Sequence, residues 1–118
     1  LLGDLAHLNN PWQPAVLKMI KMTVEGAQRA SVTAGKKKYV SVCGEAAADP
    51  ALAVVLIGLG VDTLSMNAGA IPAVAAVLKS VTKEKAQQIA AIALQQISSA
   101  EAKESARKAL PILDELGL

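Results

Sequence analysis

The chain has 118 residues, enough for one domain, and 53% of them are hydrophobic while 19% are charged. This composition excludes a disordered tail, which would have few apolar residues and a large net charge. The formal net charge is only +2, and Trp12 and Tyr39 are the only aromatic residues. The sequence therefore provides neither the basic face nor the aromatic stacking surfaces that are typical of nucleic-acid-binding proteins.

The cysteine content and the hydropathy of the chain indicate in which compartment of the cell it is found. Cys43 is the single cysteine, so the chain forms no internal disulfide, which favours a reducing cytoplasm. The longest apolar run covers residues 51–61, which is too short to span a bilayer. The first residues carry no basic segment and do not resemble a signal peptide. We therefore predict a cytoplasmic protein that binds neither nucleic acid nor a membrane.

The first half of the chain predicts a helix between a loop and a strand. Residues 1–13 read as loop, and His7 within them reads as a surface residue. Pro14 suits a first helical turn, and apolar residues recur at helical spacing from there to Ala30. The run 36–38 of three lysines reads as a solvated loop, and the β-branched run at 39–43 predicts a short strand.

The second half predicts mostly helices. Asp49 followed by Pro50 is typical of a helix start, so we expect a helix over 51–59 that ends near Gly60. Residues 61–66 predict a second strand, and residues 72–79 a further helix. Thr82 can cap the next helix. Ser98 with Glu101 has capping-box spacing for the last one, and Pro111 should interrupt it.

Strands that alternate with helices predict an α/β fold with parallel strands. Both strands are expected to be buried on each face, as parallel strands usually are. Two strands alone leave open edges, and a stable sheet usually has three or more strands. We therefore expect either that further strands belong to this sheet or that a partner chain covers its edges. The isolated chain should associate or be partly unfolded.

The segment after the first strand carries the most chemical information. It places the thiol of Cys43 at the carboxyl end of a strand, where reacting groups gather in parallel α/β folds. Residues 44–46 are expected to form a simple turn, and Gly44 would let a ligand approach the backbone. Glu45 could orient the loop or accept a hydrogen bond, or it could be a solvated carboxylate. From composition alone, a lone cysteine such as Cys43 is more often a small buried hydrophobic residue than a reactive one.

The order of residues around Cys43 resembles a known signature. The sequences VCGEAAADP (residues 42–50), LIGLGVDTLSM (56–66), AIP (70–72) and PWQPAVL (11–17) resemble the carboxyl-terminal part of phosphoenolpyruvate-utilising enzymes. Within that family, the phosphotransferases of bacterial sugar uptake are the most similar. Ala46 and Ala48 depart from the family, which often has Leu and Gly at these positions.

The resemblance implies a fold and a role for each site residue. The chain would be the carboxyl-terminal portion of a (β/α)8 TIM-type barrel, comprising its last two βα units and further helices, with earlier strands and a phospho-histidine domain elsewhere. Cys43 would be the catalytic acid that protonates the enolate of pyruvate, since an ordinary thiol is mostly protonated at neutral pH. Gly44 would contact the substrate, and Glu45 would support the loop.

The resemblance also implies a cofactor and partners. Mg²⁺ would be bound in the full-length enzyme by residues outside this chain, so the fragment alone should be inactive. The partners would be phosphoenolpyruvate, a histidine-containing phosphocarrier protein and a second copy in a homodimer. Two alternatives stay open: a fragment of a phosphoenolpyruvate synthase or pyruvate phosphate dikinase, and a non-catalytic helical interaction module in which Cys43 is buried and inert.

Overall fold

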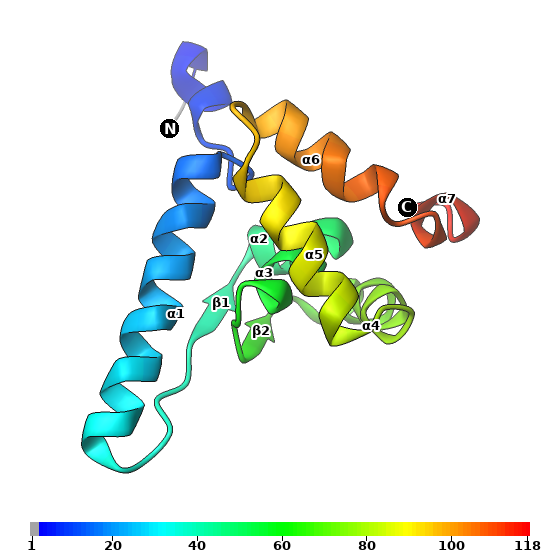
Figure 1. The fold of residues 1–118 in the computed structure, drawn as a ribbon. Coiled ribbons are helices and arrows are strands. Elements are labelled where there is room, and N and C mark those ends of the chain that lie inside the picture. The colour runs from blue at the N-terminus through cyan, green and yellow to red at the C-terminus, as the bar shows by residue number, and fades with distance from the viewer. Residues whose placement is uncertain (1–2) are drawn as a thin grey trace.

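The computed structural model describes residues 3–118 as an α/β chain that is mostly helical (Figure 1). In chain order the elements are η1 (Gly3–Leu8), α1 (Pro14–Ala34), β1 (Ser41–Cys43), α2 (Glu45–Ala48), α3 (Pro50–Gly58), β2 (Thr63–Ser65), η2 (Ala68–Ala70), α4 (Ile71–Lys79), α5 (Lys83–Leu94), α6 (Ser99–Lys108) and α7 (Ile112–Glu115). Within the described residues, no helix combines the length and the apolar character needed to cross a bilayer.

Helix α3 is the centre of the core. It packs against α2, α4, α5 and α6, and all its residues from Ala51 to Leu56 are buried. A helix that is apolar on every side has no face suited to water, so it is stable only when other helices surround it. Figure 1 shows α5 crossing α3, with α1 along one side of the molecule.

The two strands pair in parallel, as predicted, with Ser41 beside Thr63, Val42 beside Leu64 and Cys43 beside Ser65. The prediction that both faces of the strands are buried is wrong. Val42 and Leu64 pack against the core, whereas the first and last residues of each strand are exposed. Successive side chains point to opposite faces of a strand, and among residues 3–118 the helices cover only one of these faces.

The predicted helix starts are confirmed. The Asp49 carboxylate accepts hydrogen bonds from the backbone N–H groups of Ala51 and Leu52. The Thr82 hydroxyl accepts from Lys85 N, and the Ser98 hydroxyl accepts from Glu101 N. These caps satisfy amide groups that have no partner inside the helix. Pro111 interrupts the last helix, as expected, because α6 ends at Lys108 and α7 begins at Ile112.

Three local predictions need correction. Residues 3–8 form a 3-10 helix instead of loop, and α1 continues to Ala34, four residues past its predicted end at Ala30. The segment after Gly44 was expected to be a simple turn, but residues 45–48 form one turn of helix, α2. Ala47 in α2 is fully buried, and the contacts of α2 with α3 and both strands stabilise a helix that is too short to persist alone.

Candidate active site at the end of the parallel strands

Cys43 is the last residue of β1, and its side chain is exposed. This position contradicts the interaction-module alternative, which expected a buried cysteine. The neighbouring residue on β2 is Ser65, also exposed and also the last residue of its strand. The thiol therefore lies at the carboxyl end of a parallel pair, on the face of the sheet that the helices leave open.

Gly44 turns the chain away from the sheet directly after Cys43. Its backbone has φ 88° and ψ −153°, a region that is essentially restricted to glycine. A Cβ at this position would meet no other atom within 4 Å, so the need for glycine comes from the backbone conformation. The Gly44 N–H donates to Ser65 O at 2.9 Å, which extends the strand pairing one residue beyond Cys43.

Glu45 is the first residue of α2, and its side chain is exposed. The ion pairs within residues 3–118 join Lys21 to Glu25, Lys37 to Asp62, and Lys108 to Glu104, so none includes Glu45. The supporting role of Glu45 in the loop therefore stays a prediction. A negative side chain there also suits the first turn of a helix.

A hydrogen bond that the sequence did not predict lies at Asp49, directly after α2. The indole N–H of Trp12 donates to Asp49 Oδ2 at 3.0 Å, while Asp49 Oδ1 caps α3. Trp12 is only 3% exposed and Asp49 is half-buried, so the contact is partly buried. The segment from Cys43 to Asp49 is thus held at both ends: Gly44 bonds to Ser65 on β2, and Asp49 bonds to Trp12. The N-cap position of Asp49 was visible in the sequence, but its partner 37 residues away was not.

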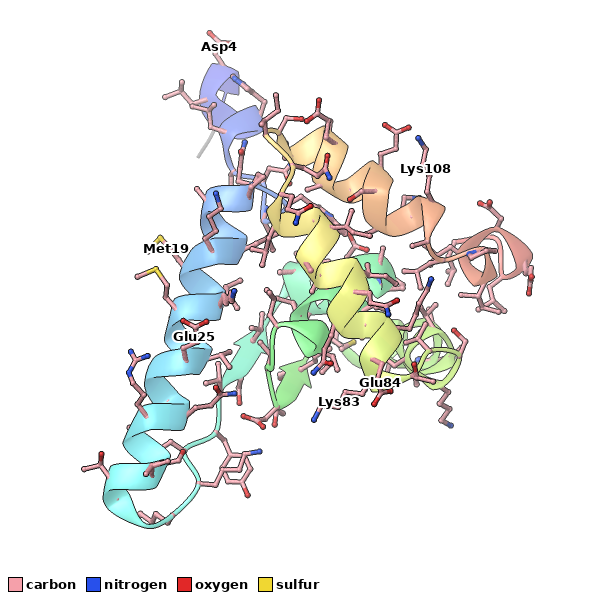
Figure 2. The ribbon with its side chains drawn as sticks, viewed as in Figure 1. Asp4, Met19, Glu25, Lys83, Glu84 and Lys108 are labelled. Atoms are coloured by element: carbon pink, nitrogen blue, oxygen red, sulfur yellow. The ribbon has the colours of Figure 1, made fainter. Side chains whose placement is uncertain are left out.

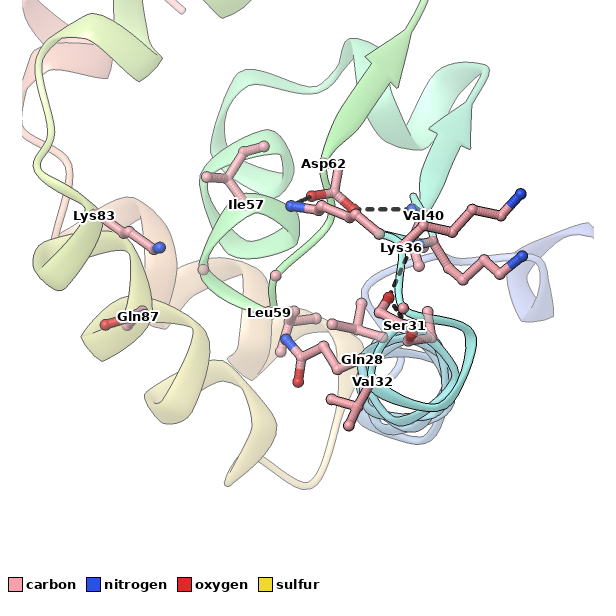
Figure 3. A pocket seen from close by; sticks show the side chains of 17 residues that line it. Gln28, Ser31, Val32, Lys36, Val40, Ile57, Leu59, Asp62, Lys83 and Gln87 are labelled. Atoms are coloured by element: carbon pink, nitrogen blue, oxygen red, sulfur yellow. Dashed lines mark hydrogen bonds and ion pairs between the residues drawn. The ribbon is translucent and has the colours of Figure 1, made fainter.

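A separate cavity of about 640 Å³ lies at the opposite end of the strands (Figure 3). Its walls include the 36–38 lysine run, Asp62, Lys83 and Gln87. Asp62 accepts from the Lys37 ammonium at 2.8 Å and from Val40 N at 2.9 Å. The lining comes from α1, α5, the end of α3 and the residues that precede the two strands, such as Val40 and Asp62, and it does not include Cys43. The cavity is therefore distinct from the site at Cys43.

The ion pair between Lys37 and Asp62 shifts the pKa of each side chain. The hydrogen bond from Lys37, followed by the one from Val40 N–H, lowers the pKa of the Asp62 carboxyl. The hydrogen bond to Asp62 raises the pKa of Lys37. One lysine of the predicted solvated loop is therefore already paired.

Comparison with known proteins identifies the family. The family described as "PEP-utilising enzyme, PEP-binding domain" matches residues 3–83. This chain belongs to the PEP-utilising enzymes. The match includes Cys43, Gly44, Glu45 and Ser65, while α6 and α7 lie beyond it.

Several relatives carry phosphotransferase names. A phosphoenolpyruvate-protein phosphotransferase of Streptomyces coelicolor is 41% identical over 92% of this chain and 18% of its own length. One from Haloferax volcanii is 38% identical over 85% of this chain and 17% of its own length. A multiphosphoryl transfer protein of Xanthomonas campestris is 42% identical over 78% of this chain and 10% of its own length. The chain thus spans less than a fifth of each relative.

The described part of this PEP-utilising chain does not fit a magnesium site. Mg²⁺ prefers an octahedral set of oxygen ligands that includes carboxylates. Residues 3–118 contain no cluster of three or more His, Cys, Asp or Glu side chains that could hold a metal ion. What the described residues bring to this site is the Cys43 thiol and the Ser65 hydroxyl.

Proposed function

We propose that this chain supplies the proton donor of a phosphoenolpyruvate-dependent protein phosphotransferase, and that the donor is Cys43. The observation that carries the proposal is the exposed thiol at the carboxyl end of a parallel strand, in a chain that belongs to the PEP-utilising enzymes. Phosphotransferase names among its relatives favour this activity over that of a synthase or dikinase.

The proposed step balances as follows. Transfer of the phosphoryl group from phosphoenolpyruvate to a protein histidine leaves the enolate of pyruvate. The electron pair of the enolate carbon–carbon double bond takes the proton of the Cys43 thiol, so a C–H bond forms at the methylene carbon and the S–H bond breaks. The products are pyruvate and a thiolate, which water then reprotonates. Gly44 has no side chain to block the approach of substrate to the thiol.

The open face of the sheet supports a larger assembly around this site. We propose that the chain is the carboxyl-terminal portion of a (β/α)8 barrel, in which the face bearing Cys43 and Ser65 points toward the barrel interior. The small polar side chains on that face, and the two unpaired strand edges, are compatible with neighbouring strands on both sides. The expected partners remain a histidine-containing phosphocarrier protein and a second copy of the protein, with Mg²⁺ bound by residues outside this chain.

The central test is Cys43→Ala in the complete gene product that contains this chain. General acid catalysis typically contributes 10²- to 10⁴-fold, so we expect pyruvate formation to fall by roughly a hundredfold or more. Phosphoenolpyruvate binding, measured by calorimetry, should be retained. Pyruvate formation at the wild-type rate in this variant would refute the role of Cys43.

A second experiment asks whether the 118 residues are active alone. Phosphoryl transfer depends on cations that position and neutralise the phosphate groups. Since the described residues offer no cluster of metal ligands, we expect no phosphoenolpyruvate turnover by the isolated chain with Mg²⁺ present. Metal-dependent turnover by the isolated chain would contradict this expectation.

A further inference from the structure

We propose that Ser65 is a second substrate-contacting residue, whose hydroxyl orients the substrate over the Cys43 thiol. The inference rests on the proposed role of Cys43 and extends it to the neighbouring strand. It starts from the register of the sheet, which pairs Cys43 with Ser65.

The register and the burial pattern place the two side chains on the same face. In a parallel pair, residues in register point to the same side, and neighbouring strands lie about 4.8 Å apart. Val42 and Leu64, the preceding pair, pack against the core. Cys43 and Ser65 therefore point away from the core, toward the open face. The hydrogen bond from Gly44 N to Ser65 O fixes this arrangement beyond the last paired residues.

The Ser65 hydroxyl is available for a ligand. It is exposed, and none of the side-chain hydrogen bonds among residues 3–118 uses it. The nearby Asn67 accepts from Ala70 N through its Oδ1. Ser41 and Thr63 lie on the same face but one layer further from the carboxyl end. Ser65 is thus the hydroxyl-bearing residue that lies directly beside Cys43 in the sheet.

The size and charge of the substrate fit this spacing. A three-carbon acid measures roughly 3–3.5 Å from its terminal carbon to its carboxylate oxygens. Together with a hydrogen bond at its carboxylate end, this length can bridge side chains on neighbouring strands, which lie about 4.8 Å apart. With its methylene carbon at the Cys43 sulfur, its carboxylate can reach the Ser65 hydroxyl. A hydroxyl donates strong, short hydrogen bonds to a carboxylate. That contact would hold one face of the enolate toward the thiol.

The test uses a phosphoenolpyruvate analogue that carries a methyl group on its methylene carbon, turned over in D₂O by the complete gene product. Deuterium delivered by a fixed donor enters one face of the enolate, so the product is a single stereoisomer. We expect Ser65→Ala to lower turnover of phosphoenolpyruvate about tenfold through loss of orientation, and to give a mixture of stereoisomers. A simple loss of stability would not change the stereochemistry of the folded fraction.

Matched variants complete the design. Ser41→Ala removes the same hydroxyl from the same face one layer away, and should keep both turnover and the single stereoisomer. Ser65→Thr restores the hydroxyl and should recover the single stereoisomer. A Ser65→Ala protein that still gives one stereoisomer would overturn this inference alone, provided that Cys43→Ala is inactive. A Cys43→Ala protein with wild-type turnover would overturn both the inference and the proposed function.

Discussion

At the scale of single residues, the contact between Lys37 and Asp62 joins the start of β1 to the start of β2. Asp62 receives hydrogen bonds from the Lys37 ammonium and from Val40 N, and its own N–H donates to Val40 O. The side chain thus continues the strand pairing where the short sheet ends. This continuation needs the ionised carboxylate, which accepts both hydrogen bonds.

The pair predicts a pH dependence of stability. Because the folded protein has a lowered pKa at Asp62, the unfolded chain takes up the proton first as the pH falls. The stabilisation is present above the ordinary value of 3.8 and disappears as the pH falls through the lower value of the folded state. Near neutral pH, the wild-type protein should unfold at a higher midpoint concentration of urea than Asp62→Asn. In acid the two midpoints should become equal. A difference that is independent of pH would contradict this.

A second residue-scale feature concerns Trp12 and Asp49. One carboxylate caps α3 and also accepts the indole N–H, so the turn before α1 and the loop after Cys43 share an anchor. The capping role follows from the local order Asp-Pro at a helix start. The second contact depends on how the turn before α1 lies against the start of α3, which no local pattern specifies.

At the scale of elements, the contact between α3 and α5 depends on Gly58. A Cβ on Gly58 would lie 2.1 Å from the backbone oxygen of Ala86, and 2.9 Å from the side chain of Ala90. The two helices are therefore close enough that only a hydrogen atom fits between them. The small residues Gly58, Ala86 and Ala90 permit this approach, and the two helices pack closely at that point.

The packing predicts opposite effects for two glycine-to-alanine changes. Gly58→Ala should destabilise the fold by about 1–3 kcal/mol or more, because the helices must separate to admit a methyl group. Gly26→Ala in α1 is the control, since its Cβ would meet only Arg29 Nη2 at 3.8 Å, and alanine there should stabilise the helix by up to about 1 kcal/mol. Urea unfolding measures both, and equal effects would disprove the close approach.

At the scale of the whole molecule, α1 presents apolar side chains that the rest of residues 3–118 leaves exposed. Met19 and Met22 are 68% and 66% exposed. Together with Val16 they recur at every third position of α1, so the three side chains share one side of the helix. Figure 2 shows Met19 pointing away from the rest of the molecule. Together with the open strand edges, this surface favours association.

We expect the isolated chain to self-associate, and the double variant Met19→Gln with Met22→Gln to reduce that association. Glutamine has a helix propensity similar to that of methionine, so α1 should stay intact. Ile97→Gln changes an exposed apolar residue elsewhere and serves as the control. Sedimentation velocity measures the species present. A stable wild-type monomer over the accessible concentrations would contradict the expectation.

The sequence by itself determined the local features of this protein: the helix caps at Asp49, Thr82 and Ser98, the interruption at Pro111, and the parallel pairing. Each follows from neighbouring residues or from the alternation of strands and helices, which act over short distances along the chain. The family was also evident, because the motifs around Cys43 and Ser65 are contiguous in sequence.

The tertiary structure alone decided what the strands expose. The sequence predicted burial on both faces because the strands are short and β-branched, but burial depends on which helices lie over each face. Helix α2 likewise exists because its own residue Ala47 is buried where α2 contacts α3 and the strands. The Trp12–Asp49 contact exists because the turn before α1 lies against the start of α3. Such features depend on residues far apart in the chain, whose proximity is set only when the whole domain packs.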